Sequence, residues 1–159
     1  MTHLKEGDQA PLFTATDQHG NEISLKELRG KKIILYFYPE DDTPTCTVQA
    51  CNLRDNETRL KQHGFTILGV SPNNEKSHLA FQKKYALPFS LLTDPTHKII
   101  NQYSVWGEKQ LYGRRYMGLH RTTFIIDEQG MIRKIFLKPK NKMHAEEILS
   151  EQGLKGWEE

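Results

Sequence analysis

Apolar runs alternate along this chain with amphipathic stretches, a pattern that predicts strands separated by helices. Two continuous apolar runs, at residues 33–38 and 65–71, indicate buried strands, because such strands need no polar face. Between them, residues 43–63 carry spaced apolar side chains among charged ones, with no Gly or Pro after Pro44 until Gly64. That spacing predicts a helix joining the two strands.

The rest of the chain continues the alternation. The further predicted elements are a hairpin at 12–25 around Gly20 and Asn21, a helix at 73–85, a strand at 87–94, a helix at 96–103, a hairpin with strands at 121–127 and 131–137, and a helix at 144–152. This order is typical of an α/β fold with a mixed central β-sheet flanked by helices. No repeat, linker or low-complexity segment divides the chain, so we expect one domain over residues 1–159.

Composition excludes several classes of function. Lys and Arg number 22 against 20 for Asp and Glu, and the basic residues are scattered, so a nucleic-acid partner is not implied. The first residues contain no apolar run long enough for a signal peptide or a membrane span, which leads us to expect a soluble cytoplasmic protein. The two cysteines of such a protein are normally reduced, which disfavours a permanent disulfide.

One cysteine lies where the predicted strand at 33–38 is followed by the next helix. This is the carboxyl end of the strand, where open α/β sheets usually place their ligand-binding or active sites. Thr43 is a favoured N-cap residue and Pro44 suits the first helical position, so Cys46 occupies the third. Unpaired backbone N–H groups and the helix dipole favour an anion there. The setting therefore favours a nucleophilic thiolate at Cys46.

Three acidic residues, Glu40, Asp41 and Asp42, precede this helix and disfavour a thiolate by repulsion. We expect their side chains to point from a loop into water, where their charges are screened. A nearby cation would add to the stabilisation of the thiolate. The residues leave two sources open, namely Arg54 on the same helix and a distant arginine brought close by the fold.

The second cysteine, Cys51, lies five positions after Cys46. In an ideal helix that separation puts the two Cα atoms roughly 8.7 Å apart, whereas a disulfide needs less than about 7 Å. The two sulfurs can therefore bond only if the first turns unwind. Such a conditional bond suits a reaction cycle with two conformations.

The segment "PEDDTPTC" has the P-x-x-x-T-x-x-C pattern, with Pro39, Thr43 and Cys46 in its fixed places, and it resembles the peroxiredoxin motif. The longer stretch "YFYPEDDTPTCTVQACNLRDN" is similar to the active-site segment of the Q-type peroxiredoxins, also called bacterioferritin comigratory proteins. "GDQAPLFTATDQHG", "LGVS", "LPFSLLTD" and "YGRRYMGLHRTTFIIDEQG" extend the similarity over most of the chain.

This resemblance implies a thioredoxin-like fold and a thiol peroxidase that reduces hydrogen peroxide and organic hydroperoxides. Cys46 matches the peroxidatic cysteine, which forms a sulfenic acid, and Cys51 the resolving cysteine, which turns that acid into an intramolecular disulfide. Thioredoxin would reduce the disulfide. Thr43 would hydrogen-bond thiolate and peroxide, Pro39 would shield the pocket, and Arg121 matches the pocket arginine. Q-type relatives are often monomers, and the family uses no cofactor.

Simpler readings remain open. Before the motif is considered, Cys46 and Cys51 can both be small buried apolar residues. Thr45 replaces the Gly that usually precedes the peroxidatic cysteine, and we expect ordinary helical backbone there. The seven histidines lack metal-ligand spacing, so no metal is assigned, and ordinary packing or a protein contact explains Trp106 and Tyr112.

Two rival functions use the same cysteines. A general thiol/disulfide exchange enzyme suits the expected fold, but the C-x-x-x-x-C spacing opposes it, because C-x-x-C is the spacing that keeps two sulfurs in bonding reach. A peroxide sensor that passes oxidation to a partner protein is compatible with every residue named above.

Overall fold

The computed structural model describes residues 1–150 of the chain. Its elements are β1 (Thr14–Thr16), β2 (Glu22–Ser24), η1 (Lys26–Leu28), β3 (Lys32–Phe37), α1 (Pro44–Asp55), α2 (Glu57–Gln62), β4 (Phe65–Ser71), α3 (Glu75–Tyr85), β5 (Ser90–Thr93), α4 (Lys98–Gln102), β6 (Trp106–Leu111), β7 (Arg114–Leu119), β8 (Thr122–Ile126), β9 (Ile132–Phe136), η2 (Asn141–Met143) and α5 (His144–Leu149).

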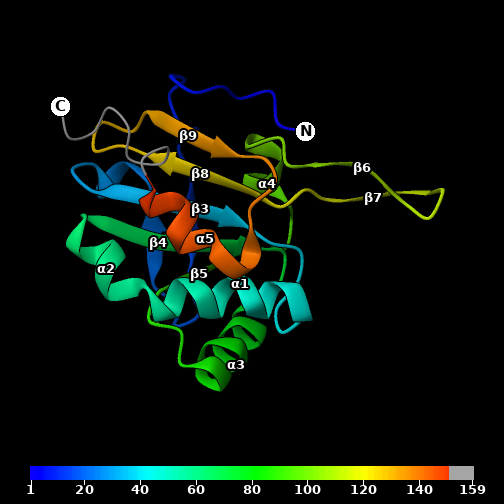
Figure 1. Cartoon of the computed structure of the whole chain (residues 1–159), viewed down its shortest axis with the longest axis horizontal. Coiled ribbons are helices and arrows are strands. Elements are labelled where there is room, and N and C mark those ends of the chain that lie inside the picture. The colour runs from blue at the N-terminus through cyan, green and yellow to red at the C-terminus, as the bar shows by residue number, and fades with distance from the viewer. Residues whose placement is uncertain (151–159) are drawn as a thin grey trace.

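A five-stranded sheet in the order β5-β4-β3-β8-β9 forms the centre of the molecule (Figure 1). Strand β3 pairs in parallel with β4 and antiparallel with β8, so the sheet is mixed. Every side chain from Ile33 to Tyr38 is buried. The predicted mixed sheet, with residues 33–38 as its buried central strand, is confirmed.

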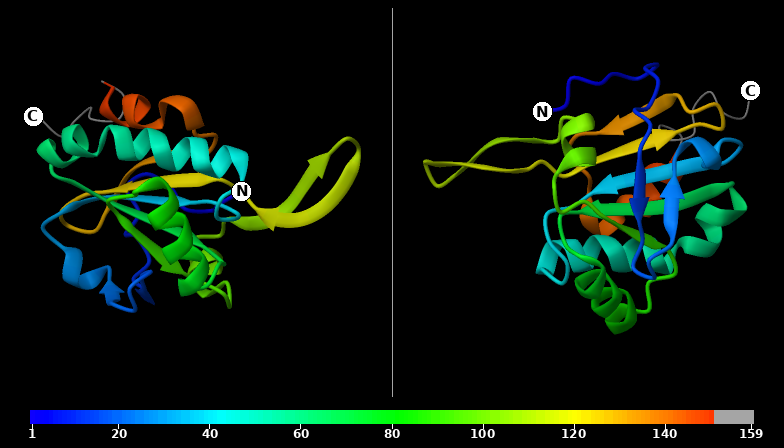
Figure 2. Two further views of the ribbon diagram at one scale, coloured as in Figure 1. Left: turned by 90° about the horizontal axis from the view of Figure 1, so that it is seen from below. Right: turned by 180° about the vertical axis from the view of Figure 1, so that it is seen from behind.

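The alternating side chains of β3 enter two separate hydrophobic clusters. Ile33, Leu35 and Phe37 join one cluster, which also contains residues of α4 and of the N-terminal segment. Ile34 and Tyr36 join the other, together with buried residues of α1, α3 and α5. The period of two along a strand thus gives the sheet two covered faces. Figure 2 shows helices on both sides of the sheet.

The predicted helix at 43–63 is wrong in one respect, because the chain forms two helices there. Helix α1 ends at Asp55, Asn56 adopts φ −110° and ψ 9°, and α2 follows. The Asn56 side chain donates from Nδ2 to the Asn52 carbonyl oxygen at 2.9 Å and to Glu146 at 3.1 Å. Asparagine bonds of this kind compete with helical backbone and mark the break.

Strands β6 and β7 form a hairpin that the sequence analysis did not predict. They pair from Trp106↔Leu119 to Leu111↔Arg114 and project away from the sheet (Figures 1 and 2). The turn consists of Tyr112 and Gly113, both at positive φ, as two-residue hairpin turns require. Tyr112 is 99% exposed, so ordinary packing does not explain it.

The predicted hairpin at the start of the chain forms as β1 and β2, which pair antiparallel. The predicted helix at 144–152 corresponds to α5, and residues 151 and 152 lie outside the described part of the chain. Within residues 1–150, no helix combines the length and the apolar character needed to cross a bilayer.

Candidate active site

Cys46 lies in the first turn of α1, just beyond the carboxyl end of the central strand. Thr43 is the N-cap residue, with extended backbone at φ −89° and ψ 158°, and Pro44 opens the helix, as predicted. The Thr43 hydroxyl does not cap the helix; Oγ1 donates instead to the carbonyl oxygen of Glu40 at 3.1 Å. Cys46 is only 1% exposed, so its sulfur faces the protein.

The cation beside Cys46 is Arg121. Its Nη2 donates to Cys46 Sγ at 2.9 Å, so a positive charge lies beside the sulfur. The register of the sheet explains the approach: Phe37, the last residue of β3, pairs with Thr122, the first of β8. Arg121 therefore enters beside the end of β3, where the loop to Cys46 begins.

Arg54, the local alternative, is directed elsewhere. Its Nη1 donates to the carbonyl oxygen of Tyr85 at 2.8 Å, and its Nη2 forms an ion pair with Asp55 at 3.0 Å. Of the two sources of positive charge left open by the sequence, the fold brings the distant arginine to the sulfur.

Gln49, which the sequence analysis did not single out, supports that arginine. It follows Cys46 by three residues and so shares its helix face. Gln49 is fully buried, and its Oε1 accepts from Arg121 Nη1 at 3.4 Å. Within the described residues its Nε2 has no hydrogen-bond partner. The sequence signal that could have identified Gln49 is its spacing of three residues from Cys46, which puts both side chains on one face of the helix.

Tyr36 lies in the same buried cluster as Cys46, under helix α1. Burial, and then the negative charges of Cys46 and Asp41, raise the pKa of the Tyr36 hydroxyl well above its usual value. The hydroxyl therefore keeps its proton at neutral pH and cannot serve as a base. Arg121 remains the group that meets negative charge on the sulfur.

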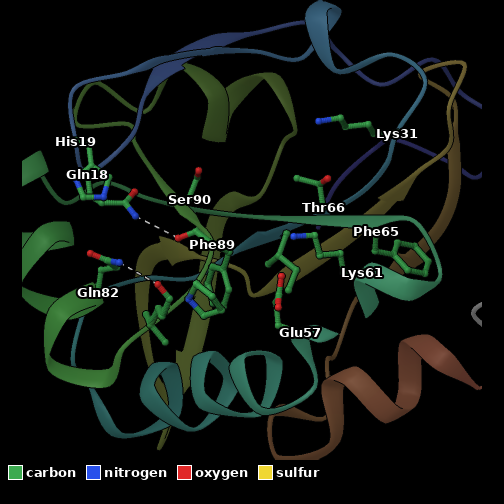
Figure 3. Close-up of a pocket in the computed structure, with 13 residues that line it drawn as sticks. Gln18, His19, Lys31, Glu57, Lys61, Phe65, Thr66, Gln82, Phe89 and Ser90 are labelled. Atoms are coloured by element: carbon green, nitrogen blue, oxygen red, sulfur yellow. Dashed lines mark hydrogen bonds between the residues drawn. The ribbon is translucent and has the colours of Figure 1, made fainter. Parts of the chain in front are cut away.

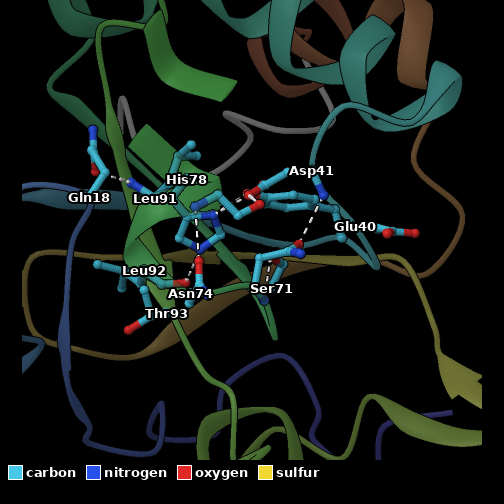
Figure 4. Close-up of polar contacts among 12 residues, drawn as sticks. Gln18, Glu40, Asp41, Ser71, Asn74, His78, Leu91, Leu92 and Thr93 are labelled. Carbon is cyan, nitrogen blue, oxygen red and sulfur yellow. Dashed lines mark hydrogen bonds and ion pairs between the residues drawn. The ribbon is translucent and has the colours of Figure 1, made fainter. Parts of the chain in front are cut away.

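The expectation that the three acidic residues point into water is wrong for Asp41. This side chain is buried and accepts hydrogen bonds from Tyr38 at 2.6 Å and Ser77 at 2.7 Å, while His78 Nδ1 lies 2.7 Å from it (Figure 4). His78 Nε2 faces the Leu92 carbonyl oxygen at 3.0 Å. Both nitrogens of the His78 ring therefore face oxygen atoms.

The other two acidic residues remain exposed. Asp42 binds Lys84 Nζ and the Tyr85 hydroxyl, each at 2.7 Å, and adopts φ 58°. Two of the three acidic residues, Asp41 and Asp42, therefore lie within ion-pair distance of a basic side chain, His78 and Lys84 respectively. Pairing, more than exposure to water, therefore limits their repulsion of a thiolate.

Cys51 lies on the same helix as Cys46, half-buried, and both thiols are free. Helix α1 is continuous from Pro44 to Asp55, so the two sulfurs are held apart in this conformation. Thr45 lies within that helix and is not among the residues at positive φ, which confirms the expectation of ordinary backbone there. Pro39 follows the buried Tyr38, just beyond the end of β3, and is itself half-buried.

Two cavities bear on the location of the site. One, of about 460 Å³, lies at the starts of β4 and β5, the sheet edge opposite Cys46 (Figure 3). Its Gln18 and Gln82 amides are bound to backbone groups. The other, of about 420 Å³, is lined by Met1, Lys109, His120, Arg121, Thr122, Leu137, Lys138 and Pro139. This second cavity adjoins the cysteine's arginine.

No cluster of three or more His, Cys, Asp or Glu side chains suited to a metal ion occurs among residues 1–150.

Comparison with known proteins agrees with this geometry. Residues 6–135 match the model of the AhpC/TSA family. Peroxiredoxin Bcp of Escherichia coli K12 is 42% identical over 150 residues, covering 94% of this chain and 96% of the relative. A mutant of Xylella fastidiosa PrxQ superposes with a TM-score of 0.90 at 28% identity over 100% of both chains. The bacterioferritin comigratory protein of Xanthomonas campestris, studied for alkyl peroxide reduction, gives 0.84 at 27%, covering 96% and 97%.

The chain therefore belongs to the AhpC/TSA family, and its fold is thioredoxin-like, as the sequence resemblance implied. Within that family it is a peroxiredoxin of the Bcp/PrxQ type, a peroxidase. The two cysteines of α1 are consistent with a peroxidatic and resolving pair.

Proposed function

We propose that this peroxidase works through Cys46, with Cys51 as the resolving cysteine and thioredoxin as the reductant. The observation that carries the proposal is the 2.9 Å contact between Arg121 Nη2 and Cys46 Sγ at the start of α1. It combines the two features that activate a thiol, a helix N-terminus and an adjacent cation. Cys51 lacks both.

In the first step the Cys46 thiolate attacks the terminal oxygen of the peroxide. An S–O bond forms as the O–O bond breaks, and the departing oxygen takes a proton and leaves as water or an alcohol. Negative charge moves from sulfur to that oxygen, and the Arg121 guanidinium and the α1 backbone N–H groups are already oriented to stabilise it. Cys46 becomes a sulfenic acid.

In the second step the Cys51 sulfur displaces the sulfenic oxygen, which leaves as water, and an S–S bond forms. The thioredoxin dithiol then supplies two electrons and two protons by thiol–disulfide exchange, and both cysteines return to thiols. Thioredoxin is the general dithiol reductant of the cytoplasm, where we propose that the protein acts as a monomer.

We assign two further residues to the first step. The Thr43 hydroxyl lies three residues before Cys46 and rotates from the Glu40 carbonyl oxygen to donate to the bound peroxide. Pro39 limits the access of water to the thiolate. Because the cavity beside Arg121 has Leu137 and Pro139 in its wall, we propose that organic hydroperoxides are substrates alongside hydrogen peroxide. The alkyl peroxide activity studied in the Xanthomonas relative supports this.

The test follows peroxide-dependent oxidation of NADPH through thioredoxin reductase and thioredoxin, with intact-mass analysis after peroxide. We expect no turnover from Cys46→Ser. The parent loses two hydrogens, whereas Cys51→Ser gains oxygen atoms on Cys46. Turnover by Cys46→Ser would contradict the proposal. A disulfide that thioredoxin does not reduce would favour a peroxide sensor, and rapid insulin reduction a general exchange enzyme.

A further inference from the structure

The two halves of helix α1 are held to the body of the protein in different ways. In the first half, Pro44, Thr45 and Val48 are exposed, and a cavity of about 270 Å³ separates them from Asn141 and Lys142. On the opposite face, Cys46, Gln49 and Ala50 are buried, and Arg121 contacts the first two of them. This half is therefore held to the protein on one face, while its other face is exposed.

The second half is anchored by Asn52, the residue next to Cys51. Its Oδ1 accepts from the backbone N–H of Ala145 at 2.7 Å. Its Nδ2 donates to the Lys142 carbonyl oxygen at 3.0 Å and to the Glu146 carboxylate at 3.1 and 3.2 Å. One side chain thus binds the start of α5, which lies beside α1 (Figure 1).

Other groups strengthen the same anchor. Asn56 bridges the Asn52 carbonyl oxygen and Glu146, and Arg54 binds the Tyr85 carbonyl oxygen at 2.8 Å. Leu53 is fully buried. The last turn of α1 is therefore bound by side-chain hydrogen bonds to α5 and α3 as well as by core packing.

We propose that Asn52 is a positioning residue that stops the unwinding of α1 at Cys51. The inference rests on the proposed function, in which Cys46 and Cys51 form a disulfide, and it adds which sulfur moves. Cys51 stays fixed against α5, and the segment carrying Cys46 opens and brings its sulfur to Cys51. The five-residue separation, up to about 17 Å when extended, easily permits the closer approach that a disulfide needs.

The Ala145 amide reports this directly, because its N–H donates to Asn52 Oδ1. Amide hydrogen exchange is measured by NMR on the reduced and the disulfide forms of the parent. We expect residues 47–51 to exchange on the order of tenfold faster in the disulfide form, and Ala145 to change by less than about twofold. If Ala145 accelerates with them, or if residues 47–51 stay protected, the proposal is wrong.

Intact mass separates this result from the proposed function. If the mass does not fall by two hydrogens after peroxide treatment, no disulfide has formed, and both proposals are wrong. A protein that forms the disulfide but releases the Ala145 amide keeps the proposed function and overturns the role of Asn52.

A pair of variants gives a second measurement. Asn52→Ala is compared with Asn74→Ala, because Asn74 caps α3 by accepting from Ser77 N–H at 2.9 Å, away from α1. We expect Asn52→Ala to lower the Tm of the disulfide form by about 3 °C more than that of the reduced form, since the anchor is then the main restraint on α1. Asn74→Ala lowers both forms equally. Equal losses in both forms of Asn52→Ala contradict the proposal.

Discussion

The two ends of helix α1 differ in the contacts that hold them to the rest of the protein. At its start, a buried sulfur meets a guanidinium that arrives from another part of the sheet, while the neighbouring side chains face water and a cavity. Six residues further on, the amide of Asn52 and the buried Leu53 hold the helix to α5 and to the core. A single helix thereby combines a segment able to change conformation with one that resists change.

Under the proposed function, the charge contact in the first half of α1 serves chemistry more than stability. One contact between a guanidinium and a sulfur is readily lost when the sulfur is oxidised, because a sulfenic acid no longer carries the thiolate charge. The apolar and amide contacts of the second half do not depend on the oxidation state of Cys46. Substitutions in the two halves of α1 should therefore have different effects.

The largest effect is expected from the charge that reaches Cys46. Arg121→Gln keeps polar N–H groups but removes the positive charge, so the rate constant for peroxide should fall by about 10² or more. The measurement is stopped-flow reaction of the reduced protein with peroxide. Arg54→Gln is the matched control, since Arg54 contacts Tyr85 and not Cys46. If the rate constant falls equally in the two variants, the contact of Arg121 with Cys46 has no special role in the reaction.

A smaller but still large effect concerns stability and should fall on the other half of α1. Leu53→Ala deletes a fully buried side chain and should lower the free energy of unfolding by about 2–5 kcal/mol. Val48→Ala, at a position 38% exposed, should cost less than about 1 kcal/mol. Urea unfolding of the reduced protein measures both. Similar costs at the two positions would show that the first half is as firmly packed as the second.

The smallest effect concerns the loop before the helix. Hydrogen bonds from Lys84, and then from Tyr85, lower the pKa of the Asp42 carboxyl below its usual 3.8. A lowered folded-state pKa stabilises the fold above the unfolded value, and that contribution is lost as pH falls through the folded value. The urea midpoint of the parent should therefore fall slightly more between pH 5 and 3 than that of Asp42→Asn.

Asparagine is a suitable replacement at position 42 because it tolerates the φ of 58° found there. Identical pH dependence in the two proteins would mean that the exposed pair of Asp42 and Lys84 adds nothing to stability.

Local features of the site could be predicted from the sequence, because they depend on neighbours in the chain. The N-cap position of Thr43, the proline that follows it and the place of Cys46 in the first turn all come from helix-start chemistry. The approach of Arg121 was expected from resemblance alone. Physically it depends on the register between β3 and β8, which local pattern does not specify.

Features that depend on distant partners were missed. Asp41 is buried because Ser77 and His78, more than thirty residues away, supply its hydrogen bonds. The break at Asn56 depends on Glu146, ninety residues away. The β6–β7 hairpin was not predicted because its turn is Tyr-Gly in place of the usual Asn-Gly.

The central claim is that Cys46, although nearly inaccessible, is the thiol that reacts with peroxide. The most direct measurement is the second-order rate constant for hydrogen peroxide with two reduced single-cysteine variants, Cys51→Ser and Cys46→Ser. We expect Cys51→Ser to react at about 10⁴ M⁻¹ s⁻¹ or faster, in the range of an enzyme, and Cys46→Ser to react orders of magnitude more slowly. A fast reaction in Cys46→Ser together with a slow one in Cys51→Ser would show that Cys51 is the thiol that reacts with peroxide, and would contradict the claim.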